Sequence, residues 1–441
     1  MRLVPLFAAL ILTSLSAAAA EPITLTQAMA DPDWIGPPVE EAWWRWDGQA
    51  AQYLLKRDGA SIRDTWQVGI DGAAPKRIED VALADIDASD AVLDAANTRT
   101  AFVRNGDVFV RDLRSGVLTQ LTRTLDRETR PQWSRDGGLV WRVGEAWYRW
   151  DGRNVVQAAL LKAEDAPGKA PKADDLRERQ LRLIDTLRND RDRREAARKQ
   201  DEAWRVADKT RAPAPIYLGK DVAIADSALS PDGRWLLIAT TEKGADAGTE
   251  GKLPKYVTES GYEEFEAART RVGRNDPLPQ KIWLAETATG KVRELSSDAL
   301  PGIKDDPLAA LRKTAGKPAL KGNRSLQVTA LQWTSDSQNV ALVLRAIDNK
   351  DRWIASVDLT AATLQPRNRL HDDAWINWSF NDFGWLPDNK MLWYLSEESG
   401  YSHLYALNGN TRTQLTDGRW EASAVQVSRD GSSFYFLCNR E

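Results

Sequence analysis

The chain has 441 residues, enough for about two or three ordinary domains or for one array of repeats. Its 60 Lys and Arg nearly balance its 64 Asp and Glu, so it lacks the excess basic charge that nucleic-acid-binding proteins concentrate. One cysteine and two histidines exclude a disulfide framework and disfavour a zinc site or a multi-histidine centre. Tryptophan, with 19 residues, outnumbers tyrosine and phenylalanine, which favours β-sheets with half-buried aromatic faces.

Residues 1–20 have the pattern of a secretory signal peptide. Arg2 supplies the positive charge, an apolar run extends from Leu3 to Leu15, and Ala18 to Ala20 offer a small-residue cleavage site. The run is shorter than the roughly 20 apolar residues of a transmembrane helix, although an uncleaved anchor is the alternative. We expect a periplasmic or secreted protein with no membrane span after cleavage, and a lead-in segment at 21–40.

A sequence pattern repeats after this segment. Each copy consists of a short predicted strand, an Asp-Gly or similar turn, and a second apolar strand. Gly adopts positive φ without a Cβ clash and Asp bonds to its own backbone, so each turn predicts a hairpin. The copies are Gln132–Gly137 with Leu139–Val143, Ala228–Gly233 with Trp235–Ala239, Leu331–Asp336 with Val340–Leu344, Phe383–Asp388 with Met391–Leu395, and Val425–Gly431 with Phe434–Leu437.

The second half of the pattern also recurs, as a strand, a Ser-Gly, Thr-Gly or Asn-Gly turn, and a short strand that ends in Leu. Examples are Val108–Leu121, Ile282–Leu295 and Leu404–Leu415. Together the halves make four strands in about 40–50 residues, the length of one propeller blade. Blades are expected at 41–82, 84–124, 128–160, 215–297, 325–370, 374–418 and 420–441, the last with two strands only.

The sequence therefore predicts an all-β fold, a β-propeller of about seven to eight four-stranded blades over residues 41–441, with an incomplete last blade. Stacked blades bury the two faces that a single sheet would expose. An antiparallel β-sandwich is the alternative fold, but the strands of a sandwich do not repeat a four-strand sequence pattern.

Three insertions interrupt the array, at about 160–214, 245–280 and 299–325. The first contains a charged helix over 173–209, whose alternating charges indicate a solvated, ion-paired surface. The second begins Gly- and Lys-rich and continues as Tyr256–Glu266. The third has the composition of a loop.

Three stretches resemble a known family, the dipeptidyl peptidase IV branch of the prolyl oligopeptidase superfamily in its bacterial secreted form. They are Leu25–Gly36, Tyr256–Tyr262 and Trp393–Tyr405, and the similarity extends over residues 22–441. The resemblance implies an N-terminal propeller followed by an α/β-hydrolase domain with a Ser-His-Asp triad. We expect the hydrolase domain to be absent from this chain, because no G-x-S-x-G motif occurs and the last blade is incomplete.

The resemblance also implies one candidate binding site, at Glu263 and Glu264. Relatives of this branch use a propeller-borne glutamate pair to hold the free amine of the substrate through charge-assisted hydrogen bonds. A solvent-exposed segment with local Glu–Arg pairing is the alternative. Glu397-Glu398 is a rival pair, which we interpret as structural because it follows a strand at a turn.

No catalytic residue is assigned. His371 precedes two aspartates and His403 follows a serine, but adjacent residues rarely attain triad geometry, so both histidines are interpreted as structural. Neither a metal site nor a cofactor is expected, since phosphate loops, calcium loops and zinc spacings are absent.

Two functions remain open at this point. The first is the non-catalytic propeller portion of an exported serine peptidase, which gates peptide access to a hydrolase domain; the chain alone should then be inactive. The second is a stand-alone periplasmic propeller that binds a peptide or protein. The partner expected in the first case is a peptide substrate, with no nucleic acid, and homo-oligomerisation is left open.

Overall fold

A computed structural model describes residues 23–30, 32–167, 174–208, 210–245, 250–270 and 277–440. The chain divides into two compact units, one that ends at Ser89 and one that begins at Asp90. The signal peptide predicted at 1–20 lies outside the described residues. No helix in the described ranges is long and apolar enough to cross a membrane.

Unit 1 is a single four-stranded antiparallel sheet preceded by a short helix. The helix begins after Thr24, whose side chain accepts a hydrogen bond from the backbone of Gln27, while the Gln27 side chain bonds back to Thr24. Its elements are α1 (Leu25–Met29), the 3-10 turn η1 (Pro32–Ile35), β1 (Val39–Trp44), β2 (Ala50–Lys56), β3 (Arg63–Gly69), β4 (Lys76–Arg77) and η2 (Asp80–Asp85), and the sheet order is β1-β2-β3-β4.

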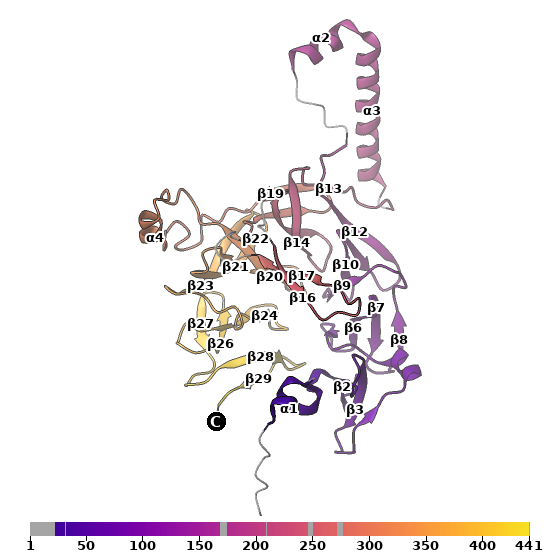
Figure 1. The fold of residues 1–441 in the computed structure, drawn as a ribbon. Coiled ribbons are helices and arrows are strands. Elements are labelled where there is room, and N and C mark those ends of the chain that lie inside the picture. The colour runs from indigo at the N-terminus through magenta and orange to yellow at the C-terminus, as the bar shows by residue number, and fades with distance from the viewer. Residues whose placement is uncertain are drawn as a thin grey trace, which may run out of the picture. The chain divides into compact units, whose positions relative to one another are not determined.

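Unit 2 begins with two sheets (Figure 1). The first contains β5 (Val92–Leu93), β6 (Arg99–Arg104), β7 (Asp107–Asp112) and β8 (Leu118–Gln120) in that order. The second contains β9 (Glu128–Trp133), β10 (Leu139–Val143), β11 (Ala146–Trp150), β12 (Val155–Lys162) and β13 (Ile216–Tyr217), and β13 pairs in parallel with β12. The long helices α2 (Asp175–Leu183) and α3 (Asp185–Ala207) lie between β12 and β13 and project away from the sheets in Figure 1.

Four further sheets and a hairpin complete unit 2. One sheet contains β14 (Val222–Leu229), β15 (Trp235–Glu242), β18 (Lys281–Glu286) and β19 (Lys291–Glu294), and the hairpin of β16 (Glu250–Lys255) and β17 (Glu264–Thr270) is inserted between β15 and β18. The next sheets are β20 (Leu326–Trp333), β21 (Val340–Ala346), β22 (Asp351–Asp358) and β23 (Thr363–His371), then β24 (Phe383–Trp385), β25 (Met391–Ser396), β26 (His403–Asn408) and β27 (Thr411–Gln414), and last β28 (Ala422–Val427) with β29 (Phe434–Cys438). The short helix α4 (Ala309–Thr314) precedes β20.

The sheets of unit 2 stack face to face through a series of apolar clusters. Along β10, Val140 packs toward the β14–β19 sheet while its neighbours Leu139 and Trp141 pack toward the β5–β8 sheet. Along β21, Val343 packs toward the β24–β27 sheet, and Leu344 belongs to the cluster shared with the β14–β19 sheet. Because side chains alternate across a strand, each inner sheet is buried on both faces, as the propeller prediction requires.

The predicted turns adopt the expected backbone. The residue after the turn aspartate has positive φ in every copy: Gly137, Gly233, Ser337, Asn389 and Gly431 have φ values of 85, 80, 62, 59 and 70°. The residue types are those that tolerate this region best, apart from Ser337. The all-β fold of four-stranded antiparallel sheets, consistent with a propeller, is thus confirmed. Strand β13 pairs with the sheet before it, although it lies within the repeat unit predicted at 215–297, and that unit also contains the separate β16–β17 hairpin.

The abundant tryptophans have a specific use in this stack. Trp133, Trp333 and Trp385 occupy the same place in the repeat, at the end of the first strand of a sheet. Each indole N–H donates to a backbone carbonyl of the first strand of the preceding sheet, to Val92, Ala228 and Gln332 respectively, at 2.9–3.1 Å. One side chain thereby fills the gap between two sheets and satisfies a carbonyl there.

Two details of the insertions differ from the sequence predictions. The single helix expected over 173–209 is broken at Ile184, which has an extended backbone, and the guanidinium of Arg188 donates to the carbonyls of Leu181 and Arg182 at the end of α2. This capping satisfies carbonyls that a continuous helix would have bonded internally. The third insertion, expected to be a loop, contains the helix α4.

Candidate functional site

The topology gathers the insertions of unit 2 at one end of its sheets. In a four-stranded meander, the second turn and the connection to the next sheet lie at the same end. In three sheets the second turn accepts a backbone hydrogen bond from the connection that leads to the next sheet. These bonds run from Glu128 N to Gly106 O, from Ile376 N to Asn349 O, and from Ala422 N to Ser402 O, at 2.8–2.9 Å. We call this end the insertion face; it carries the α2–α3 segment, the β16–β17 hairpin, the 295–325 connection and the turns at 105–106, 347–350 and 397–402.

The opposite end carries the Asp-Gly-type turns, and we call it the turn face. Turns of different sheets are bonded to each other there. Arg135 N donates to Ser335 O at 2.8 Å, Ser335 N donates to Asn389 Oδ1 at 3.0 Å, and Asn97 Nδ2 donates to Arg429 O at 3.0 Å. The turn face is therefore tightly cross-linked, whereas the insertion face holds the longer and more exposed segments.

The predicted pair, Glu263 and Glu264, lies on the insertion face at the start of β17. Both side chains are exposed. Glu264 Oε1 accepts a hydrogen bond from Ser260 Oγ at 2.7 Å, and Lys255 pairs with Glu266 instead, at 2.8 Å. The expected Glu–Arg pairing with Arg269 or Arg271 concerns side chains outside the described residues. The pair is thus accessible to a cationic ligand, and one of its carboxylates has a fixed orientation.

The same hairpin exposes several large apolar side chains. Leu253, Tyr256, Val257, Tyr262 and Phe265 are 58–98% exposed. An isolated two-stranded hairpin is marginally stable in water, and grouped exposed apolar side chains mark contact surfaces. The glutamate pair therefore lies on an arm suited to contact another molecule or domain.

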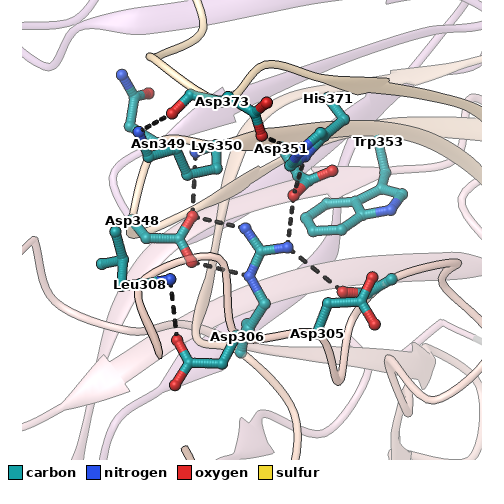
Figure 2. Close-up of polar contacts among 12 residues, drawn as sticks. Asp305, Asp306, Leu308, Asp348, Asn349, Lys350, Asp351, Trp353, His371 and Asp373 are labelled. Atoms are coloured by element: carbon teal, nitrogen blue, oxygen red, sulfur yellow. Dashed lines mark hydrogen bonds and ion pairs between the residues drawn. The ribbon is translucent and has the colours of Figure 1, made fainter. Parts of the chain in front are cut away.

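A buried ion-pair cluster anchors the 295–325 connection on the insertion face (Figure 2). Arg324, 2% exposed, donates to Asp348 at 2.6 and 2.8 Å and also to Asp351, which is fully buried. Asp351 in addition accepts from Arg369 at 2.6 Å and contacts His371 Nδ1 at 3.0 Å. In Figure 2 the carboxylates of Asp348 and Asp351 face each other across a guanidinium, with Trp353 beside it.

The cationic partners of Asp351 explain why the pKa of its carboxyl is low despite burial. Burial alone would raise the pKa of this carboxyl, but hydrogen bonds from Arg369, Arg324 and His371 outweigh burial and hold the pKa below its ordinary value. The cluster joins β22, β23 and the 295–325 connection, so on the insertion face it holds the segment that leaves the fourth sheet against the fifth sheet.

A cavity of about 360 Å³ adjoins this cluster. The lining of the cavity includes two carboxylates, Glu397 and Asp372, and the indole of Trp375, which is 60% exposed. All residues that line it are Arg369, Leu370, His371, Asp372, Trp375, Ile376, Glu397 and Glu398. Burial raises the pKa of Glu397, and the nearby Glu421 and Asp372 carboxylates add to the rise.

The two carboxylates of the rival pair have different surroundings. Glu398 contacts Arg412 and the Tyr394 hydroxyl, as a structural residue would. The Glu397 carboxylate accepts a long hydrogen bond from Asn377 Nδ2, at 3.4 Å. Beneath them lies the fully buried Arg352, whose guanidinium bonds to neutral oxygens of Asn381, Asn368, Leu395 and Ser396, and burial lowers its pKa to about 10.

The two histidines have different polar partners. His371 lies between two carboxylates, with Nδ1 3.0 Å from Asp351 and Nε2 3.2 Å from Asp373. His403 is 1% exposed and uses Nδ1 toward Thr416 Oγ1 and Nε2 toward the carbonyl of Gly418. None of these four partners, all among the described residues, is a serine hydroxyl.

The described ranges contain no group of three or more His, Cys, Asp or Glu side chains that could hold a metal ion.

A family model matches the chain over residues 314–441: the dipeptidyl peptidase IV (DPP IV) N-terminal region. The resemblance is confirmed over this range. Of the three stretches that suggested it, Trp393–Tyr405 lies within the match, and Leu25–Gly36 and Tyr256–Tyr262 lie outside it. No curated protein matches the chain.

Solved structures of low sequence identity were also found. A dipeptidyl aminopeptidase IV candidate from Bacteroides ovatus ATCC 8483 is 11% identical, with 88% of this chain and 49% of that chain covered and a TM-score of 0.42. Porphyromonas gingivalis dipeptidyl peptidase 4 is 11% identical, with 93% and 51% covered and a TM-score of 0.45. TolB from Acinetobacter baumannii is 12% identical, with 86% and 64% covered and a TM-score of 0.33. The chain thus spans about half the length of the two dipeptidyl peptidase structures.

Sequence reasoning missed the cluster around Asp351 and the cavity beside it. Arg324, Asp348 and Asp351 look like ordinary charged loop residues, and only the pairing of β22 with β23 brings Asp351 opposite His371. Glu397 was assigned to a turn, which is correct, but its half-buried position beside Arg369 and His371 of the preceding sheet leaves no local signal in the sequence.

Proposed function

We propose that this chain is the propeller portion of an exported serine peptidase of the dipeptidyl peptidase IV type, and that its insertion face receives peptides on their way to a hydrolase domain. The observation that supports this most is the placement of the insertions. The glutamate pair, the apolar hairpin and the ion-pair cluster all lie at the same end of the sheets, and the family match at 314–441 includes part of that end.

Within this proposal, Glu263 and Glu264 hold the free amine of the peptide. Two exposed carboxylates at adjacent positions offer charge-assisted hydrogen bonds to an ammonium group, and Ser260 orients one of them. Fixing the amine fixes how many residues precede the bond that is cut. The proposal assigns the propeller no catalytic group of its own.

The experiment joins this chain to the hydrolase domain that its gene or a neighbouring reading frame encodes, and compares Glu263→Gln and Glu264→Gln with Glu259→Gln. Glu259 is an exposed carboxylate of the same hairpin turn, so the control removes the same charge nearby. Loss of one ammonium–carboxylate contact should lower kcat/KM for free-amine peptides about ten- to a hundredfold, which corresponds to about 1.5–3 kcal/mol.

Peptides with an acetylated N-terminus should be cut poorly by the wild type and should show no further loss in the variants. Equal rates on free-amine peptides for all four proteins would remove the glutamates from the site. If DNA beyond codon 441 encodes no G-x-S-x-G motif in any frame, the stand-alone peptide- or protein-binding propeller becomes the better account.

A further inference from the structure

Arg345 carries a guanidinium group on the insertion face that has no acidic partner in the described part of the chain. The residue lies near the end of β21, just before the 347–350 turn, and its side chain is half-buried. None of its nitrogens forms a hydrogen bond or an ion pair with a described residue, and of the three only Nε is buried. The terminal nitrogens Nη1 and Nη2 are therefore the donors that remain open to solvent.

The strand register places a second cation beside Arg345. Arg345 lies directly opposite Arg352 in the pairing of β21 with β22, so the two side chains point to the same face of the sheet. Two residues further into the strands, the opposed pair Val343 and Ile354 belongs to the apolar cluster shared with the β24–β27 sheet. Both arginines therefore face that sheet. Like charges directly opposite each other are destabilising unless an anion lies near them.

The nearby charged groups leave Arg345 without a counter-charge. Arg352 is fully buried, and its terminal nitrogens already donate to four protein oxygens, so it adds positive charge but no free donor. Glu397 and Glu398 act on Arg352 through space, whereas burial alone lowers the pKa of Arg345. Asp382, just before β24, is no partner either, because burial raises the pKa of its carboxyl with no cation to lower it.

An indole fixes the position of this guanidinium. Arg345 Cζ lies over the ring of Trp378, 5.0 Å from its centroid. Trp378 is itself held in place, since its N–H donates to Asn349 Oδ1 and its ring packs against the apolar cluster. A guanidinium over an aromatic ring keeps the N–H groups at its edge available, and a carboxylate accepts two parallel hydrogen bonds from such an edge.

We propose that Arg345, held over Trp378, binds a carboxylate group of a peptide through Nη1 and Nη2. One carboxylate neutralises the unpaired guanidinium and supplies the acceptors that the described residues do not. The proposal rests on the proposed function only in taking a peptide as the ligand, and it needs neither a hydrolase domain nor the glutamate pair. The carboxylate is that of the peptide C-terminus or of an acidic side chain, and the experiment separates these two sources.

The test uses three tripeptides with acetylated N-termini. The first is acetyl-trialanine with a free C-terminal carboxylate, and the second is its C-terminal amide, which has no charge. The third is acetyl-alanyl-glutamyl-alanine amide, whose only carboxylate is in the side chain. Acetylation removes the free amine, so the glutamate pair takes no part. Binding to the 441-residue chain is measured by calorimetry, and by the rise in Tm that a ligand specific for the folded state produces.

We expect at least one of the two carboxylate peptides to bind at least tenfold more tightly than the uncharged amide. Arg345→Gln should weaken that binding at least tenfold, while its own Tm without peptide stays equal or increases, because a half-buried charge without a counter-charge is removed. Arg345→Lys keeps the charge but loses the planar pair of donors, so it should weaken binding severalfold.

Arg234→Gln is the matched control. Arg234 also lies over an indole, that of Trp235, with Cζ 5.2 Å from the ring centroid. It differs from Arg345 in having an acidic partner, Glu286 at 3.7 Å, and in lying on the turn face. The substitution removes the same charge from the same kind of stacked pair and should leave peptide binding unchanged.

Two results would overturn the proposal: equal binding of the amide and both carboxylate peptides, or undiminished binding by Arg345→Gln. In either case the contact with Trp378 is the only role of Arg345. Tighter binding of inorganic phosphate than of either carboxylate peptide, lost in Arg345→Gln, would assign the arginine to a different anion and also contradict the proposal. Glu263→Gln with Glu264→Gln should leave binding of these blocked peptides unchanged, so a failure here is distinguishable from a failure of the glutamate pair.

Discussion

Single tryptophans connect neighbouring sheets of unit 2, and Trp333 is the clearest case. It is 2% exposed and donates to the Ala228 carbonyl at 3.1 Å. Trp333→Phe removes the donor, leaves that carbonyl unpaired and opens a small cavity. We expect the free energy of unfolding to fall by about 2–3 kcal/mol.

Denaturant unfolding measures this effect, with Trp375→Phe as the control. Trp375 is 60% exposed and should change stability by less than about 0.5 kcal/mol. Equal effects of the two substitutions would show that the indole bond between sheets contributes nothing.

Asp351 is the residue whose loss should matter most on the insertion face. It is fully buried and accepts from Arg324 and Arg369, so Asp351→Asn leaves two guanidinium groups with too little negative charge. Breaking a buried ion pair in this way typically costs about 3–5 kcal/mol. Asp373→Asn, which removes an exposed carboxylate that also contacts His371, should have little effect.

The pH dependence of stability follows from the same residue. The folded pKa of Asp351 lies below the ordinary aspartate value, so its contribution is present above about pH 4 and is lost as the pH falls through the folded pKa. The wild type should therefore lose stability on acidification below about pH 4, and Asp351→Asn should lose less over that range. Parallel pH profiles for the two proteins would contradict the assignment.

At the scale of elements, the α2–α3 segment is an arm that the sheets do not require. Its helices are rich in exposed ion pairs, such as Arg198–Glu202 at 2.6 Å, which contribute little to stability. The strands at its two ends, β12 and β13, lie side by side, with Leu161 opposite Ile216. Replacing residues 168–212 with a short Gly-Ser linker should leave Tm unchanged. A fall of more than about 5 °C would show that the arm supports the sheets.

The edge strand β29 is a second element with a testable consequence. Among the described residues it pairs with β28 only, and Tyr435 and Leu437 are 65% and 68% exposed. Exposed edges associate with other chains, and a lysine on the edge prevents this. The 441-residue chain should therefore self-associate with increasing concentration in sedimentation experiments, and Leu437→Lys should reduce the association. A wild type that stays monomeric at all concentrations would exclude this behaviour.

For the whole molecule, the strand–turn–strand repeat could be predicted from the sequence because each turn and strand depends on residues close together in the chain. A turn such as Ser230–Gly233 needs only neighbouring residues to adopt its backbone, and strand alternation shows in the sequence itself. The Asp351 cluster depends on the register of β22 with β23, which brings Asp351 opposite His371. Such long-range contacts leave no pattern in the sequence, and the break at Ile184 depends on an arginine four residues later.

The whole chain is also expected to be inert as a hydrolase. Both of its histidines have their ring nitrogens occupied, and no G-x-S-x-G motif occurs in its sequence. A fluorophosphonate needs a serine activated by a base and an oxyanion hole. It should therefore leave the 441-residue chain unlabelled. Stoichiometric labelling that a single serine substitution abolishes would overturn the non-catalytic assignment.

The central claim is that peptides meet this protein at its insertion face. It is tested most directly by photocrosslinking: a short free-amine peptide that carries a photoreactive side chain is irradiated with the 441-residue chain, and the crosslinked residues are identified by mass spectrometry. We predict crosslinks in the β16–β17 hairpin and in the 295–325 connection, reduced by Glu263→Gln with Glu264→Gln. Crosslinks confined to the turn face, around residues such as Asp136, Asp232 and Asp336, would contradict the account.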